Sequence, residues 1–181
     1  MTPADSRSTV HAAARRLFAE RGYRAVTVRD IAAAAGVSPA LVIKMHGSKA
    51  ELYMAAGPVP LPLSELGVPR DRLGAALVRQ VLERRDRAVT EPWSTLPLSV
   101  LQSPSPDRTR SEVQQRVLGD LASLIGDTTG SRRHATAVAC QLVGLAEGIR
   151  ALGFFPAPET PAEDLVALYS PSIQRHIDAC G

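Results

Sequence analysis

Residues 27–49, TVRDIAAAAGVSPALVIKMHGSK, decide the fold of this 181-residue chain, because they hold the start and stop signals of three successive helices. Each start is a hydroxyl residue whose side chain can cap a first turn: Thr27, Ser38 and Ser48. Each stop is a glycine, the residue that favours the left-handed conformation past a helix end: Gly36 and Gly47. The pattern predicts two short helices joined by a tight turn, with a third helix directly behind them.

The preceding segment predicts one more helix that packs against these three. Thr2, Pro3 and Asp5 form a start signal, and Gly22 ends the helix. Its apolar residues recur at helical spacing along one face: Val10, Ala13, Ala14, Leu17 and Phe18. Residues 1 to about 55 are therefore interpreted as a three-helix core and the start of a fourth helix. The alternative, a generic small helical bundle, does not require the Gly-Val-Ser-Pro turn.

Positive charge is concentrated in the same region of the chain. Residues 1–50 contain eight Lys or Arg and three acidic residues, whereas the remainder contains thirteen basic and fifteen acidic residues. A basic segment is often only a solvated face, but phosphate attraction requires such a balance, and the helix-turn-helix pattern lies inside it. The charge distribution therefore favours DNA as a partner of the N-terminal segment.

Residues 10–52 resemble the N-terminal domain of the TetR family of bacterial repressors, without a gap. The matching residues are Ala13, Phe18, Gly22, Tyr23, Thr27, Ile31, Ala32, Ala35, Gly36, Val37, Ser38, Gly47, Ser48, Lys49 and Leu52. The resemblance implies an all-α protein. We expect a three-helix helix-turn-helix domain over residues 1–56, and a larger helical domain over residues 63–181 for effector binding and dimerisation.

The resemblance also implies which residues contact DNA, with the helix from Pro39 to Met45 in the major groove. The expected contacts are Thr27, Ser38, Pro39, Ala40, Leu41, Lys44, Met45, His46 and Lys49. Lys44 and Lys49 are the strongest candidates, because capping or core packing can explain most of the others. The chain departs from the family pattern at three positions. Ile43 replaces a usual Tyr, His46 replaces a usual Phe, and Met45 replaces a His or Tyr. His46 is expected either to fill a core position as the neutral imidazole or to donate to a phosphate.

The rest of the chain also shows helical patterns. Prolines from 58 to 62 exclude a helix interior there, so the fourth helix should end near Ala56, followed by a stiff connector or a simple loop. Further helices are expected over residues 70–89, 93–101, 109–125, 131–153 and from 160 onward. Thr160 and Glu163 form a capping-box pattern for the last helix, and Pro171 is expected to kink it.

The last two helices carry apolar and small residues beyond what one buried stripe requires. We expect a two-fold interface of two helices from each subunit, as the resemblance also implies. Its predicted residues are Cys140, Gly144, Leu145, Gly148, Ile149, Leu152, Leu165, Leu168, Tyr169 and Ile173. The alternative is that these faces bury one another within a monomer. Cys140 lies on an apolar helix and is itself expected to be a small buried hydrophobe.

A ligand pocket is expected between the helices near 73–101 and 113–125. Its candidate walls are Trp93, Leu96, Leu101 and Leu121, although core packing explains each of them equally well. Few charged or aromatic residues stand out in this region, which favours an apolar effector.

Other functional classes find little support in the sequence. The four histidines and two cysteines show no metal-ligand spacing, so we expect neither metal nor cofactor. No glycine-rich phosphate loop or Gly-x-Ser-x-Gly elbow occurs, which disfavours an enzyme. The N-terminus lacks a signal sequence, and no run of eighteen apolar residues suggests a membrane span. Two distant cysteines fit a reducing cytoplasm.

Two interpretations of function remain open at this stage. The first is a cytoplasmic, ligand-responsive repressor that binds a palindromic operator as a homodimer and is released by a small-molecule effector. The second is a helical binding or scaffold module with weak or vestigial DNA binding, motivated by the departures at Ile43, Met45 and His46. A helical enzyme is a third and weaker possibility.

Overall fold

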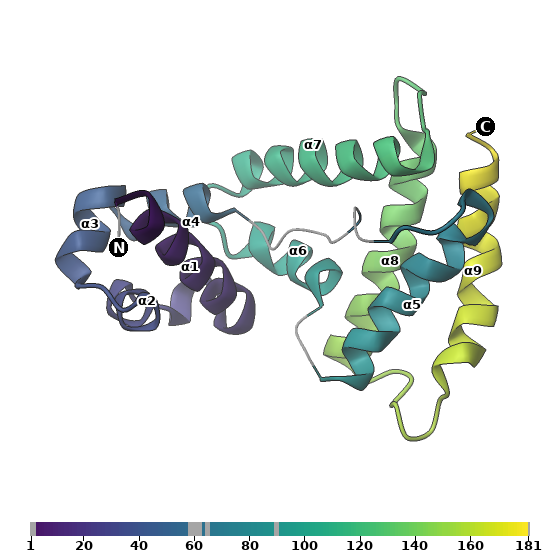
Figure 1. Ribbon diagram of the computed structural model, residues 1–181, viewed down its shortest axis with the longest axis horizontal. Helices are drawn as coiled ribbons and strands as arrows, with labels where there is room; N and C mark the ends of the chain where they lie inside the picture. Colours follow the sequence, from purple (N-terminus) through teal and green to yellow (C-terminus); the bar gives the residue numbers. More distant parts are fainter. Residues whose placement is uncertain (1–2, 58–62, 64–65, 89–90, 181) are drawn as a thin grey trace. The chain divides into compact units, whose positions relative to one another are not determined.

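The protein is all-α, as predicted. The computed structural model describes residues 3–57, 63, 66–88 and 91–180, and this part of the chain contains helices and no strand (Figure 1). The α-helices are α1 (Pro3–Ala25), α2 (Val28–Ala35), α3 (Pro39–His46), α4 (Lys49–Ala56), α5 (Leu73–Asp86), α6 (Pro92–Leu101), α7 (Pro106–Ile125), α8 (Arg133–Leu152) and α9 (Ala162–Asp178), with a short 3₁₀ turn, η2, at Arg70–Arg72 before α5.

The chain forms two compact units. The first comprises residues 1–59 and 95–111, and the second comprises residues 60–94 and 112–181. Helix α6 therefore contributes its first three residues to the second unit and its remainder to the first. The predicted proline-rich connector lies outside the described residues.

The helix boundaries predicted for residues 27–57 are confirmed by hydrogen bonds. The Thr27 hydroxyl accepts from the Asp30 backbone N–H at 3.1 Å, and the Asp30 carboxylate accepts from the Thr27 backbone N–H at 2.8 Å. This reciprocal pair is a complete capping box, which satisfies two backbone N–H groups at the start of α2. Ser38 and Ser48 accept in the same way at the starts of α3 and α4. The fourth helix ends at Ala56, where it was expected to end.

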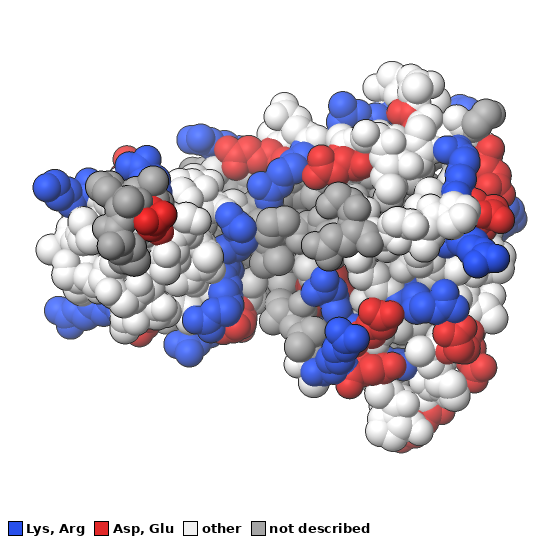
Figure 2. Space-filling view, in the orientation of Figure 1, with Lys and Arg blue, Asp and Glu red and all other residues white. Residues whose placement is uncertain are grey.

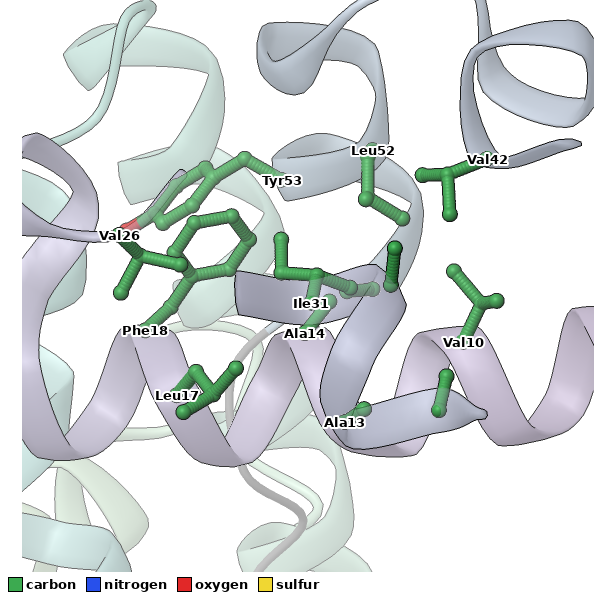
Figure 3. Close-up of a cluster of buried hydrophobic side chains, with 13 residues drawn as sticks. Val10, Ala13, Ala14, Leu17, Phe18, Val26, Ile31, Val42, Leu52 and Tyr53 are labelled. Carbon is green, nitrogen blue, oxygen red and sulfur yellow. The ribbon is translucent and has the colours of Figure 1, made fainter. Parts of the chain in front are cut away.

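A single apolar cluster holds the first unit together (Figure 3). Its buried side chains are Val10, Ala13, Ala14, Leu17, Phe18, Val26, Ile31, Ala32, Ala35, Val42, Leu52, Tyr53 and Ala56. Phe18 and Tyr53 meet edge to face with ring centroids 4.9 Å apart. The Tyr53 hydroxyl donates to the Ser99 carbonyl, so residues from α6 close over α4. The face of α1 that was predicted to be apolar is the face that packs on α2 and α4.

In the second unit, α5 packs against α9, and α8 packs against both (Figure 1). Its largest fully buried residues are Leu77, Leu82, Trp93, Leu121, Ile125, Leu142, Ile173 and Ile177. Arg70 links the C-terminal ends of two helices. Its guanidinium donates to the carbonyl of Ile125, the last residue of α7, and to the carbonyl of Ile177, in the last turn of α9. The Ile125 carbonyl lies at the end of α7, where the guanidinium supplies its donor, whereas the Ile177 carbonyl also accepts from the Cys180 N–H at 3.1 Å.

Two helix starts in the second unit differ from the sequence expectation. The N-cap residue of α9 is Pro161, and no side chain, that of Thr160 included, caps the start of this helix. Glu163 instead pairs with Arg79 of α5 at 2.8 Å, so the predicted capping box at this position is wrong. Helix α8 begins without a local cap, and the Asp127 carboxylate supplies one by accepting from the backbone N–H groups of His134 and Ala135, both at 3.0 Å.

Helix α8 is, within the described residues, the one helix long and apolar enough by composition to cross a membrane. Core helices of soluble proteins share this property, and α8 packs against α5 and α9 within the second unit. Helix α9 continues past Pro171 as one helix to Asp178.

Candidate nucleic-acid interface

Helix α3 presents an exposed side to solvent. Its buried residue is Val42, which joins the apolar cluster, whereas Pro39, Ala40, Ile43 and Lys44 are exposed. Leu41, Met45 and His46 are partly buried, and Met45 packs against the cluster. A helix anchored by one side and free along the other has the arrangement needed to enter the major groove of DNA.

The turn between α2 and α3 sets the direction of α3. Gly36 adopts the left-handed conformation with φ 67°, and the Val37 N–H donates to the Ala32 carbonyl at 3.0 Å. This is the hydrogen bond of a Schellman motif, which caps the carbonyl end of α2 and reverses the chain within two residues. Because a side chain at Gly36 would be strained at positive φ, the geometry of the turn depends on glycine.

Thr27 has less capacity to bind a phosphate than its position suggests. Its hydroxyl donates to the Asp30 carboxylate at 2.6 Å, and its backbone N–H donates to the same oxygen. These hydrogen bonds from Thr27 lower the pKa of Asp30, which keeps the carboxylate ionised and the capping box closed. Both donors of Thr27 are therefore already engaged within the protein.

Lys49 is explained by folding, contrary to expectation. Its ammonium donates to the carbonyls of Tyr23 and Val26 at 2.8 and 2.9 Å and lies 4.2 Å from the centroid of the Tyr23 ring. Two of its three N–H donors are thus used to tie the start of α4 to the end of α1. Lys44, in contrast, is exposed and makes no ion pair with a described residue. Of the two lysines, Lys44 is the one whose role the fold leaves unexplained.

The first unit carries further exposed arginines that the sequence analysis counted only as charge. Arg16 pairs with Glu20 at 3.5 Å. Four others are exposed and make no ion pair with the described acidic side chains: Arg7, Arg21, Arg24 and Arg29. Figure 2 shows basic side chains spread over the face of this unit that is in view. Arg29 lies in the first turn of α2, next to the capping box, and is a candidate that the motif comparison missed.

His46 is partly buried and packs against a second histidine of the first unit. The rings of His46 and His11 have centroids 4.8 Å apart, and the Nε2 atoms of both are enclosed without a hydrogen-bond partner. Burial, followed by the nearby charges of α1, lowers the pKa of both imidazoles, so both are neutral near pH 7. This environment fits the expectation of a neutral imidazole at a core position better than that of a phosphate donor.

The four candidate ligand-binding residues belong to both units. Trp93 and Leu121 are fully buried in the second unit, whereas Leu96 is buried in the first unit. Leu101 is 78% exposed and is therefore not a wall of an enclosed pocket. The last turn of α6 turns Leu101 toward solvent, and the ligand-binding role of the other three residues stays a prediction.

The residues predicted to form a dimer interface separate into two sets. Leu145, Leu165 and Ile173 are buried inside the second unit and cannot contact a second copy of the chain. Leu152 and Leu168 are each 65% exposed. The remaining members are exposed or partly exposed: Cys140, Gly144, Gly148, Ile149 and Tyr169. Cys140 is therefore not the buried small hydrophobe that was expected.

Metal-binding side chains do not gather in the part of the chain that is described. No group of three His, Cys, Asp or Glu residues lies close enough there to hold an ion. The candidate site is therefore the turn between α2 and α3 together with the exposed side of α3.

Comparison with known protein families gives one matching family model for each part of the chain. Residues 11–56 match the family model described as bacterial regulatory proteins, tetR family. Residues 71–177 match the model described as tetracyclin repressor-like, C-terminal domain. A search of curated proteins gave no match.

Solved structures include similar folds over nearly the whole chain. A TetR-family regulator from Streptomyces coelicolor A3 is 26% identical, with a TM-score of 0.56 and coverage of 97% of this chain and 96% of that one. A transcriptional regulator from Rhodococcus sp. Rha1 is 23% identical, with a TM-score of 0.59 and coverage of 96% and 95%. NalD, the secondary repressor of the MexAB-OprM multidrug efflux pump in Pseudomonas aeruginosa, is 22% identical, with a TM-score of 0.51 and coverage of 92% and 95%.

Proposed function

The chain belongs to the TetR family of bacterial regulatory proteins, and from this premise we propose that it is a ligand-responsive repressor that binds a palindromic operator as a homodimer. DNA-binding regulation of transcription is the role shared by the family. For this chain we propose three further features: a response to a small molecule, a palindromic operator and a homodimer. Its site of action would be the cytoplasm, where operator DNA is found.

The observation that carries DNA binding is the exposed side of α3. Ala40 can contact a thymine methyl group, and the Lys44 ammonium can donate to guanine acceptors or to a phosphate. Both residues are exposed, and neither is needed for a cap or for the apolar cluster. The exposed arginines of the same unit supply the positive field that attracts the phosphate backbone.

The observation that supports a homodimer is the apolar surface on α8 and α9. Leu152 and Leu168 each expose two thirds of their surface, and the small residue Gly144, which has open space beside it, allows a neighbouring helix to approach. Exposed leucines of this kind cost free energy in water and are stabilised when a second copy covers them. Two reading units related by a two-fold axis would then bind half-sites about 34 Å apart.

A gel-shift experiment with the DNA upstream of the protein's own gene tests DNA binding. We expect specific binding by the wild type and weaker binding by Lys44→Ala. For this variant, the slope of log affinity against log salt concentration should be smaller by about one, because one phosphate contact is lost. Arg72→Ala, an exposed substitution in the second unit, serves as the charge-matched control. Absence of specific binding under all conditions would favour the alternative function, a helical binding or scaffold module.

Sedimentation at micromolar concentration tests the dimer. Leu168→Asp places a charge on the exposed surface of α9 and should convert a dimer into monomers. Leu101→Asp, at an even more exposed leucine in the first unit, is the matched control and should leave the dimer intact. A strictly monomeric wild type would contradict the proposed two-fold interface.

A further inference from the structure

Three polar residues are buried together at the start of α6. Glu91 is 9% exposed, and Trp93 and Ser94 are fully buried. All three belong to the second unit, within the region that matches the tetracyclin repressor-like C-terminal domain. Buried carboxylates are rare unless they are paired, so each polar atom in this group calls for a partner.

Local hydrogen bonds satisfy only part of this group. One Glu91 oxygen, Oε1, accepts from the Trp93 backbone N–H at 3.1 Å, and the Ser94 hydroxyl donates to the Glu91 carbonyl at 2.8 Å. The first of these bonds caps an N–H of the first turn of α6. The other carboxylate oxygen, Oε2, and the Trp93 indole nitrogen, Nε1, are enclosed and have no hydrogen-bond partner.

The nearest charge to the unpartnered oxygen is an arginine. Arg84 Nε lies 3.6 Å from Glu91 Oε2, which is an ion-pair distance but too long for a hydrogen bond. Burial raises the pKa of Glu91 to about 7, and the Trp93 N–H and the Arg84 charge oppose this shift without cancelling it. The carboxyl group is therefore held in an enclosed position with one strong acceptor site still available.

Capping of α6 does not require these two atoms. The cap uses Glu91 Oε1, and a phenylalanine would fill the interior at position 93 without bringing an indole N–H that needs an acceptor. A bound molecule would complete both hydrogen bonds. A buried polar atom without a partner calls for an explanation, and one bound molecule accounts for both of these atoms together.

The chemistry of the two atoms defines the ligand. The indole nitrogen is a donor only, so it requires an acceptor, and the unpartnered Glu91 oxygen, Oε2, can accept from a donor. Arg84 already places one positive charge beside Glu91, so an uncharged donor fits better than a second cation. We propose that Glu91 and Trp93 form the polar end of an effector site and bind an uncharged, otherwise apolar small molecule that carries a hydroxyl or amide group.

This proposal rests on the proposed ligand-responsive function and deepens it. It also changes the expectation of a purely apolar effector, because that expectation considered only the residue types along the chain. The polar requirement arises from burial of Glu91 and the Trp93 nitrogen, which the sequence pattern does not reveal.

The protein offers a direct probe of the site, because Trp93 is its only tryptophan. An ¹⁵N-labelled sample gives one indole N–H resonance, whose position reports a hydrogen bond made by Nε1. We would titrate 2-cyclohexylethanol and compare it with ethylcyclohexane and 2-cyclohexylethylamine, which share its apolar body. The expected result is a saturable downfield shift with the alcohol and at least tenfold weaker binding of the hydrocarbon and of the amine.

A substitution tests the second half of the site. Glu91→Gln keeps the size of the side chain and should reduce the affinity for the alcohol several-fold, whereas Glu83→Gln, an exposed change on α5, should not. An unchanged indole resonance with the alcohol, equal affinity for the hydrocarbon, or tighter binding of the amine would each overturn the proposal. A saturable indole shift in a protein that fails the gel-shift experiment would reject the proposed repressor function while leaving the ligand site standing.

Discussion

The two units of this protein are organised by contacts of different range along the chain. In the first unit, helix starts are capped by residues three positions apart, as in the pair Thr27 and Asp30. In the second unit, several groups at helix starts and ends are satisfied by side chains far away in the sequence. Arg70 reaches carbonyls 55 and 107 residues away, and the Gln174 side chain accepts from the Gly74 N–H, 100 residues away.

The difference has a consequence for function. Local caps fix the ends and the turn of α2 and α3 independently of the remainder, so the reading helix is presented in one orientation. Long-range contacts in the second unit hold together segments that, under the proposed function, a ligand or a second copy would bias. A regulator needs both properties, because a ligand can act only through differing affinity for two arrangements.

The largest expected effect tests whether Ile173 belongs to the core of the second unit. Ile173→Ala should lower the free energy of unfolding by about 3 kcal/mol, because it removes a fully buried side chain and leaves a cavity. Leu101→Ala, at an exposed leucine, should change it by less than about 0.5 kcal/mol. Denaturant unfolding measures both values. A small effect for Ile173→Ala would contradict its place in the core and favour the predicted role in a subunit interface.

The next effect tests capping at a distance. Asp127→Ala should cost about 2 kcal/mol, at the upper end for a cap, because its carboxylate accepts backbone N–H groups of Thr129, His134 and Ala135. Asp127→Asn is the matched variant for a pH series, and thermal unfolding measures both.

The pH series has a defined sign. Burial opposes ionisation of Asp127, but hydrogen bonds from Thr129, Ala135 and His134 outweigh it and lower the pKa to about 2 from 3.8. A depressed pKa contributes stability that is complete above pH 4 and is lost as the pH falls through 4 to 2. The wild type should lose its advantage over Asp127→Asn in that window, and a constant difference down to pH 2 would contradict the assignment.

A smaller effect separates the two lysines of the first unit. Lys49→Ala should lower stability by about 1.5 kcal/mol, because its ammonium satisfies two carbonyls at the end of α1. Lys44→Ala should leave stability within about 0.5 kcal/mol of the wild type and weaken DNA binding instead. Paired thermal melts and gel shifts distinguish the two roles, and equal stability of the two variants would undo the distinction.

The smallest effect concerns a local cap. Ser38→Ala removes the acceptor for the Leu41 N–H at the start of α3 and should cost about 1 kcal/mol, with Ser8→Ala on the exposed surface of α1 as control. Circular dichroism during thermal unfolding measures the change. If this substitution cost more than Asp127→Ala, the contrast between local and distant capping would not hold.

The candidate interface was accessible from the sequence to different degrees. The exposure of Pro39, Ala40 and Lys44 follows from the placement of one apolar anchor, Val42, in a short helix. The engagement of Lys49 could not be predicted, because its partners lie 23 and 26 residues earlier and become neighbours only when α1 and α4 pack. The burial of Leu145 and Leu165 could not be predicted either. When a helix carries more than one apolar face, its sequence does not indicate which face packs inside the protein.

The sequence by itself determined the all-α class, the family, and the starts and ends of α2, α3 and α4. These depend on side chains within three or four positions of the backbone groups they satisfy, so the information is local. The tertiary structure alone decided that Asp127 caps α8, that Glu163 pairs with Arg79, and that Glu91 and Trp93 keep unpartnered atoms in the interior. Those outcomes depend on which helix faces meet, and that is settled by burial of the whole chain rather than by neighbouring residues.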